Sequence, residues 1–158
     1  MKDIKVSVRY NVIVGRVLAQ FGAMALINDV KEGKNFPVLN EDHTKLILEF
    51  IPRGRAVIAV GLAKYLEKIE TPEIATGNGT EQYHFNFPDG ISNGFICELQ
   101  DILEEIIIKK IIAELLLNYN LDLSMKLDGE VTVQLEELEE QVKSVPVKCC
   151  SRLRKQWL

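Results

Sequence analysis

The chain has 158 residues, of which 47% are hydrophobic and 27% are charged. This length and composition favour a single globular domain with a buried core, and they exclude a chain that is disordered throughout. The formal net charge of −4 argues against a dedicated nucleic-acid-binding domain, because such domains are usually basic.

Neither a membrane segment nor a metal site is predicted. No stretch reaches the roughly 18 uninterrupted apolar residues of a membrane span, and Lys109 and Lys110 interrupt the most apolar run. The first residues lack the apolar segment of a signal peptide. Three cysteines, Cys97, Cys149 and Cys150, are too few and too irregularly spaced for a disulfide framework or a zinc site. We therefore expect reduced thiols in a cytoplasmic setting, with no metal and no cofactor.

The first elements in chain order are a strand and a helix. Apolar residues alternate with polar ones over residues 4–10, which predicts a half-buried strand. Beyond Tyr10 the apolar residues recur every three or four positions, which predicts a helix from about Asn11 to about Lys31.

A second helix is predicted to begin after Asn40, whose side chain suits an N-terminal cap. Its apolar pattern extends to Ile69. Pro52 lies inside this pattern, and it predicts a kink or a division into two short helices because proline has no backbone donor. Gly54 and Gly61 predict positions where a neighbouring helix approaches closely.

A loop over residues 71–81 leads to a second short strand at about 82–87. Here Tyr83, Phe85 and Phe87 share one face, and His84 and Asn86 lie on the other.

Two more helices follow. The third runs from about Asn93 to Asn118, and a looser stretch separates it from a last helix at about Glu130 to Val145, which Pro146 ends. We therefore predict a mostly helical α+β fold, with about four helices in a bundle and a small antiparallel sheet at one end. Residues 1–146 form the single domain, and residues 147–158 form a basic tail or a further strand.

The third helix is apolar on two faces. Leu99, Leu103 and Ile106 gather on one side, whereas a second group lies nearly half a turn away. One account is a central helix that the chain's own elements surround. In the other account one half packs inside and the second half contacts another subunit. The candidate contact residues are Ile108, Ile111, Ile112 and Leu115.

No motif predicts an enzyme. His43 and His84 have no catalytic partners around them, and "TGNGT" (residues 76–80) lacks the lysine of a phosphate loop. "EELEE" (residues 136–140) is interpreted as a solvated helix face. Cys149 and Cys150 lie near positive charges that could lower a thiol pKa, and structural cysteines are the alternative interpretation.

The C-terminal segment is the one asymmetric charge feature. Its positive residues are not balanced by any acidic residue, and it ends in two apolar side chains. Such a tail can bind an acidic protein surface or lie near nucleic acid, or it can be a frayed, solubilising end. The candidate contact residues here are Arg152, Arg154, Lys155 and Trp157.

In its layout the chain resembles the small head-to-tail connector (neck or adaptor) proteins of tailed bacteriophages. The resemblance covers nearly the whole chain. It rests on "IKVSVRY" running into a helix, on "NEDHTKLILEF" beginning a helix that ends in "LAKYLEKI", and on the aromatic strand "YHFNFPDG". The apolar helix ending in "IIAELLLNY" and the arginine-bearing end "SRLRKQW" complete it.

The resemblance implies a non-enzymatic virion structural protein without a cofactor. Many copies would form a ring that joins the portal to tail proteins, with DNA passing through the channel. The expected locations are the virion and, during assembly, the host cytoplasm. From the residues alone, a small cytoplasmic binding module or DNA-associated accessory module is the alternative.

Overall fold

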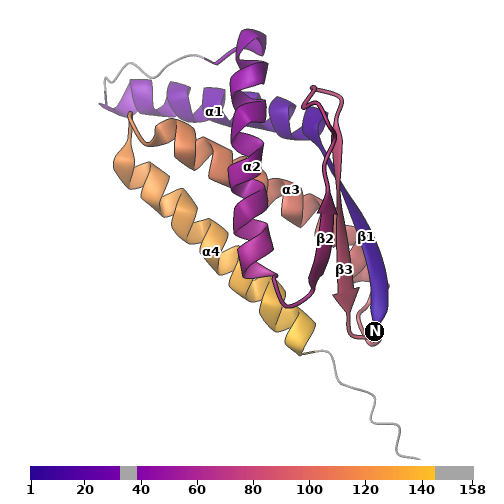
Figure 1. Ribbon diagram of the computed structural model, residues 1–158. Coiled ribbons are helices and arrows are strands. Elements are labelled where there is room, and N and C mark those ends of the chain that lie inside the picture. The colour runs from indigo at the N-terminus through magenta and orange to yellow at the C-terminus, as the bar shows by residue number, and fades with distance from the viewer. Residues whose placement is uncertain (33–38, 145–158) are drawn as a thin grey trace, which may run out of the picture.

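The computed structural model describes residues 1–32 and 39–144, with the backbone alone for residues 28–32. Four helices and a three-stranded antiparallel sheet make up these residues, so the predicted fold class is confirmed (Figure 1). The elements are β1 (Lys2–Arg9), α1 (Tyr10–Glu32), a single 3-10 turn (Glu41–His43), α2 (Thr44–Gly61), β2 (Leu66–Glu70), β3 (Thr80–Phe87), α3 (Asn93–Leu116) and α4 (Leu121–Lys143).

The sheet has the order β1-β3-β2, and β3 pairs antiparallel with both neighbours. Tyr83, Phe85 and Phe87 project from β3 into the core, where neighbouring rings stack with centroids 6.2 and 5.1 Å apart. The predicted aromatic face is therefore confirmed. It turns the sheet into one wall of the core, and the helices form the rest.

Strand β2 was not predicted, because its apolar spacing imitates a helix. Leu66 lies opposite Phe85 and Ile69 lies opposite Tyr83, with a register shift between Leu66 and Lys68. This bulge adds one residue, so two side chains three positions apart share a face. The second helix therefore ends at Gly61 instead of near Ile69.

Asn40 caps the 3-10 turn before α2, and α2 itself begins at Thr44 without a side-chain cap, so the predicted cap lies one turn ahead of the helix. The Asn40 side chain accepts a hydrogen bond from the backbone N–H of Asp42 in the 3-10 turn that leads into the helix. Pro52 lies within one continuous helix, so the chain does not divide there into two helices. Gly54 and Gly61 are confirmed as points of close approach, since an added Cβ would lie 3.0 Å from Ile107 of α3 at the first and 2.9 Å from Leu135 of α4 at the second.

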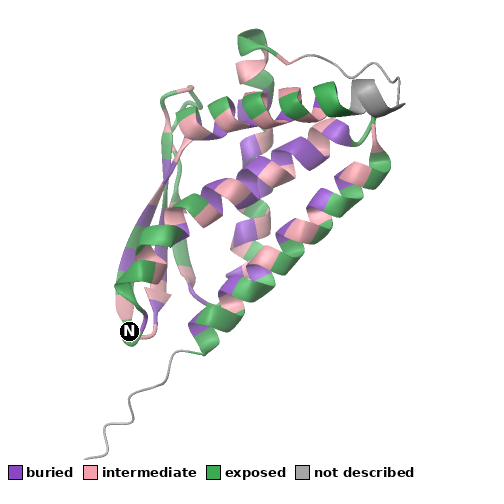
Figure 2. Ribbon diagram, turned by 180° about the vertical axis from the view of Figure 1, so that it is seen from behind, coloured by how far each residue is buried: buried purple, intermediate pink, exposed green. Residues whose placement is uncertain are grey.

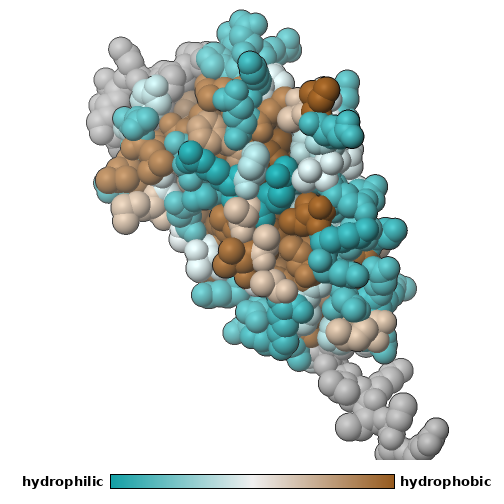
Figure 3. Space-filling model, in the orientation of Figure 1, coloured by the Kyte–Doolittle hydropathy of each residue, from teal (hydrophilic) through white to brown (hydrophobic). Residues whose placement is uncertain are grey.

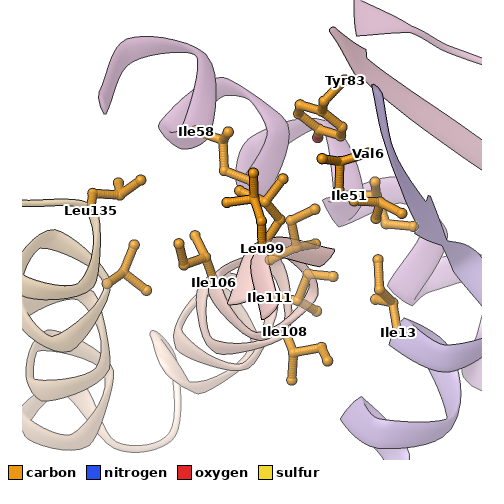
Figure 4. Close-up of a cluster of buried hydrophobic side chains, with 14 of the residues drawn as sticks. Val6, Ile13, Ile51, Ile58, Tyr83, Leu99, Ile106, Ile108, Ile111 and Leu135 are labelled. Atoms are coloured by element: carbon orange, nitrogen blue, oxygen red, sulfur yellow. The ribbon is translucent and has the colours of Figure 1, made fainter. Parts of the chain in front are cut away.

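Helix α3 is the centre of the molecule, and the chain's own elements surround it (Figure 4). It packs against α1, α2, α4 and β1. Ile108, Ile111 and Ile112 are fully buried inside the chain, and Leu115 is partly buried against the same core. The hypothesis that Ile108, Ile111 and Ile112 contact another subunit is therefore corrected, because their apolar surface is covered within one copy, whereas for Leu115 it stays a prediction.

Helix α4 begins at Leu121, about nine residues earlier than predicted, because Asn120 caps it. The Asn120 side chain accepts from the backbone N–H of Leu123. Ser124 is buried and donates to the backbone carbonyl of Ala113 at 2.7 Å, which joins the first turns of α4 to α3. The predicted end at Val145 lies outside the described residues.

Candidate functional site

A buried ion pair joins α2 to the start of β3. Glu81 shares the inward face of β3 with the three aromatic residues and is fully buried. The Arg55 side chain donates from Nε to Glu81 Oε2 at 2.5 Å, and Glu81 Oε1 has no hydrogen-bond partner. Burial, followed by the negative charge of Glu81, raises the pKa of Tyr10 to about 12. The ion pair and the neutral Tyr10 side chain thus join the start of α1, α2 and β3 inside the core.

A second ion pair, between the partly exposed Arg9 and a buried carboxylate, joins the end of β1 to the middle of α3. Glu104 is fully buried, and Arg9 donates to its two carboxylate oxygens from Nε and Nη2, each at 2.9 Å. The backbone N–H of Arg9 also donates to Glu104 Oε1 at 3.0 Å. Arg9 alone thus donates hydrogen bonds to both oxygens of the carboxylate, which fixes the point where β1 continues into α1.

The histidine and cysteine residues that the sequence offers as candidates for catalysis or metal binding do not lie together. The His43 side chain accepts from the backbone N–H of Asn40 at the start of α2, and His84 lies buried on the opposite side of the sheet from the aromatic core, 3.4 Å from Glu70. Cys97 is exposed on α3. No group of three or more His, Cys, Asp or Glu side chains is placed to hold a metal ion in the part of the chain that the structure describes.

The outer face of α1 is an uncharged helix surface that the described part of the chain leaves uncovered. Asn11, Gly15, Ala19 and Ala23 recur every four residues and are all exposed, and Leu26 continues the line with 70% of its surface exposed (Figure 2). We call these five residues the α1 outer face. No atom lies within 4 Å of where a Cβ on Gly15 would be, so the space outside the helix is open.

By length and composition, residues 10–27 of α1 could cross a membrane, and only 33% of them are buried within the chain. The candidate window therefore lies in α1, not in the run containing Lys109 and Lys110. The opposite side of this window, with Ile13, Val17 and Phe21, is packed into the core. A helix whose inner side is part of a folded core behaves as a surface helix of a globular domain.

More apolar side chains are exposed at the end of the molecule where α1 ends. The α3–α4 connection lies at this same end in both ribbon views (Figures 1 and 2). Leu26 and Ile27 come from α1, and each is more than half exposed. Leu117 and Tyr119 from the connection and Leu121 at the start of α4 are each about half exposed. We call these five residues the apolar end. These side chains expose apolar surface that water contacts unfavourably, and Leu26 belongs to both groups.

An apolar groove lies between α2 and α4, on the side of the molecule that faces the viewer in Figure 3. It has a volume of about 500 Å³. Its lining residues are Ala56, Val57, Val60, Gly61, Thr132, Leu135, Glu136 and Glu139.

The structure brings together few of the sequence-predicted contact residues. Ile108, Ile111 and Ile112 lie side by side in the core, whereas Arg152, Arg154, Lys155 and Trp157 lie outside the described residues. Sequence reasoning missed the α1 outer face. A signal was present, because Arg16 is the only charged residue between Tyr10 and Ile27 and small residues recur there every four positions.

Comparison of the chain with protein-family models, with curated protein sequences and with solved structures finds no match.

Proposed function

We propose that this protein is a virion structural protein, a subunit of a head-to-tail connector or neck ring that joins a portal to a tail by protein–protein contacts. The α1 outer face is the observation that carries the proposal. This face carries no charge, and Leu26 is 70% exposed at its end, so a protein partner is a chemically suitable cover for it. In this proposal the protein is not an enzyme and needs no cofactor.

A second copy of the chain fits the α1 outer face in chemistry. Its five residues carry no charge, so two copies can meet there without repulsion despite the net charge of −4. Gly15, Ala19 and Ala23 have short side chains or none, which allows another helix to approach closely.

The size of this surface indicates how strongly it associates. From the rise of about 1.5 Å per residue and a width of about 10 Å, the α1 outer face buries only about 500 Å² over both partners. Stable interfaces bury roughly 1,200–2,000 Å². Contact through α1 alone is therefore weak and depends on concentration, and a ring requires the apolar end or a portal protein as well.

Light scattering of the purified protein over a range of concentrations, alone and with a candidate portal protein, tests the proposal. We expect the mass to rise with concentration and with the portal protein. Ala19→Arg should abolish this rise, because it places a charge on the outer face. Ala75→Arg makes the same change at an exposed position on the β2–β3 loop and should leave association unchanged. A strict monomer that also binds no portal or tail protein would contradict the proposal.

The alternative is a small cytoplasmic binding or DNA-associated accessory module, which the basic tail favours. Lys148, Arg152, Arg154 and Lys155 are four positive charges without an acidic residue among them. Retention of DNA at low salt, lost when the residues after Pro146 are deleted, would support this function. If the intact protein does not retain DNA at low salt, the alternative is refuted.

A further inference from the structure

The groove between α2 and α4 has an apolar floor that the described chain leaves open. Val60 is 80% exposed and is the most exposed large apolar residue of α2. Gly61 lies directly against Leu135, so the two helices meet at the base of the groove and diverge above it. Figure 3 shows apolar side chains gathered here beside hydrophilic ones. The shape and lining suit one or two large apolar side chains.

The rim of the groove is acidic. Glu136 and Glu139 line it, and the stretch from Glu130 to Ser144 holds five glutamates and one lysine. Glu139 pairs with Lys143 at 2.8 Å. Glu136 forms no ion pair with any of the described residues, so its charge is available to a cationic partner.

We propose that the chain's own C-terminal segment, residues 147–158, occupies this groove. Trp157 and Leu158 supply the large apolar side chains, and the four positive residues of the segment match the acidic rim. Opposite charges on groove and segment fix the orientation, whereas burial of the indole supplies the larger part of the affinity.

The distances allow the segment to reach the groove of its own copy. Trp157 lies thirteen positions beyond Ser144, which is up to about 43 Å of extended chain. The groove residues Leu135 to Glu139 lie only about 10 Å back along α4 from Ser144, at about 1.5 Å per residue. A short tether gives an effective concentration in the millimolar range, which favours the same copy over another one. This inference does not depend on the proposed association between copies.

Trp157 is the only tryptophan in the chain, so its fluorescence reports the position of the segment directly. In the folded full-length protein we expect emission at shorter wavelength than in urea and quenching by acrylamide reduced several-fold. Val60→Asp should return the emission wavelength and the acrylamide quenching to values near those in urea, because it places a charge in the groove. Val133→Asp is the matched control, since Val133 is exposed on α4 and does not line the groove.

Circular dichroism of each variant establishes that the domain is folded. Docking in the same copy predicts fluorescence that is independent of protein concentration. Three results would overturn the inference. The first is equal quenching in folded and urea-unfolded protein. The second is an equal response of the two variants. The third is protection that grows with protein concentration, which would place the segment on another copy.

Discussion

Removing Arg55 should destabilise the protein far more than an ordinary loss of one surface charge. The Arg55 side chain is 25% exposed, and its partner Glu81 is not exposed at all. Glu81 Oε1 already lacks a hydrogen-bond partner. Arg55→Met keeps most of the side-chain volume and leaves this buried carboxylate without its cationic partner. Such a change costs roughly 3–5 kcal/mol.

Other variants separate the buried charge from the loss of contacts. Glu81→Gln removes the charge but keeps the shape, so we expect a smaller cost of about 1–3 kcal/mol. The double variant Arg55→Met with Glu81→Leu should recover much of the stability lost in Arg55→Met, because an apolar pair replaces an ion pair in the core. Lys45→Met is the control: it lies exposed on the same helix and should change stability by less than about 0.5 kcal/mol.

Urea denaturation followed by circular dichroism measures these free energies of unfolding. For a domain of this size each 1 kcal/mol lowers Tm by about 2–4 °C, so Arg55→Met should lower Tm by roughly 6–20 °C. If Arg55→Met costs no more than Lys45→Met, or if the double variant is as unstable as the sum of its single variants, the reasoning about the buried pair is refuted.

Three further predictions concern the core. Gly54→Val should cost about 1–3 kcal/mol because it overpacks the contact with Ile107, whereas Gly129→Ala in open space on α4 should stabilise by about 0.5–1 kcal/mol; equal effects in urea denaturation would contradict this. The Tyr10 pKa of about 12 lies above its usual 10.0. The stability that its neutral side chain contributes is therefore complete below pH 10 and is lost as pH rises through 12. The free energy of unfolding should thus fall by about 2–3 kcal/mol over this pH range, and Tyr10→Phe should remove this fall. An unchanged pH profile in that variant would count against the prediction. Ser124→Ala removes the donor to Ala113 and should cost about 1 kcal/mol in the same assay.

The spacing of apolar residues predicted the elements in which burial of one face alone sets the pattern. The strand β1, the aromatic face of β3 and the starts of α1 and α3 all follow from simple alternation or from spacing of three and four. The failures have local physical reasons. A bulge gave Leu66 and Ile69 of β2 a helical spacing, and the Asn120 cap began α4 in a stretch rich in turn-forming residues.

The sequence of α3 could not show whether a partner covers this helix. A helix with two apolar faces fits a central position in one chain and contact with a partner equally well. Its cover comes from segments distant in sequence. Gly54 of α2 lies against Ile107, Ser124 of α4 bonds to Ala113, and Arg9 of β1 reaches a buried carboxylate. Only the tertiary arrangement shows that the chain itself covers the isoleucines on both faces of α3, and that an uncovered helix face belongs to α1.

The most direct test of this account is the reactivity of a thiol placed on the α1 outer face. In a variant with the three native cysteines replaced by serine, Ala19→Cys adds a small probe where we expect a second copy to bind, and Ala75→Cys adds the same probe elsewhere. The reaction rate of Cys introduced at 19 with a small thiol reagent should fall several-fold as protein concentration rises, while that at 75 stays constant. A rate at position 19 that does not change with concentration, or with an added portal protein, would contradict the account.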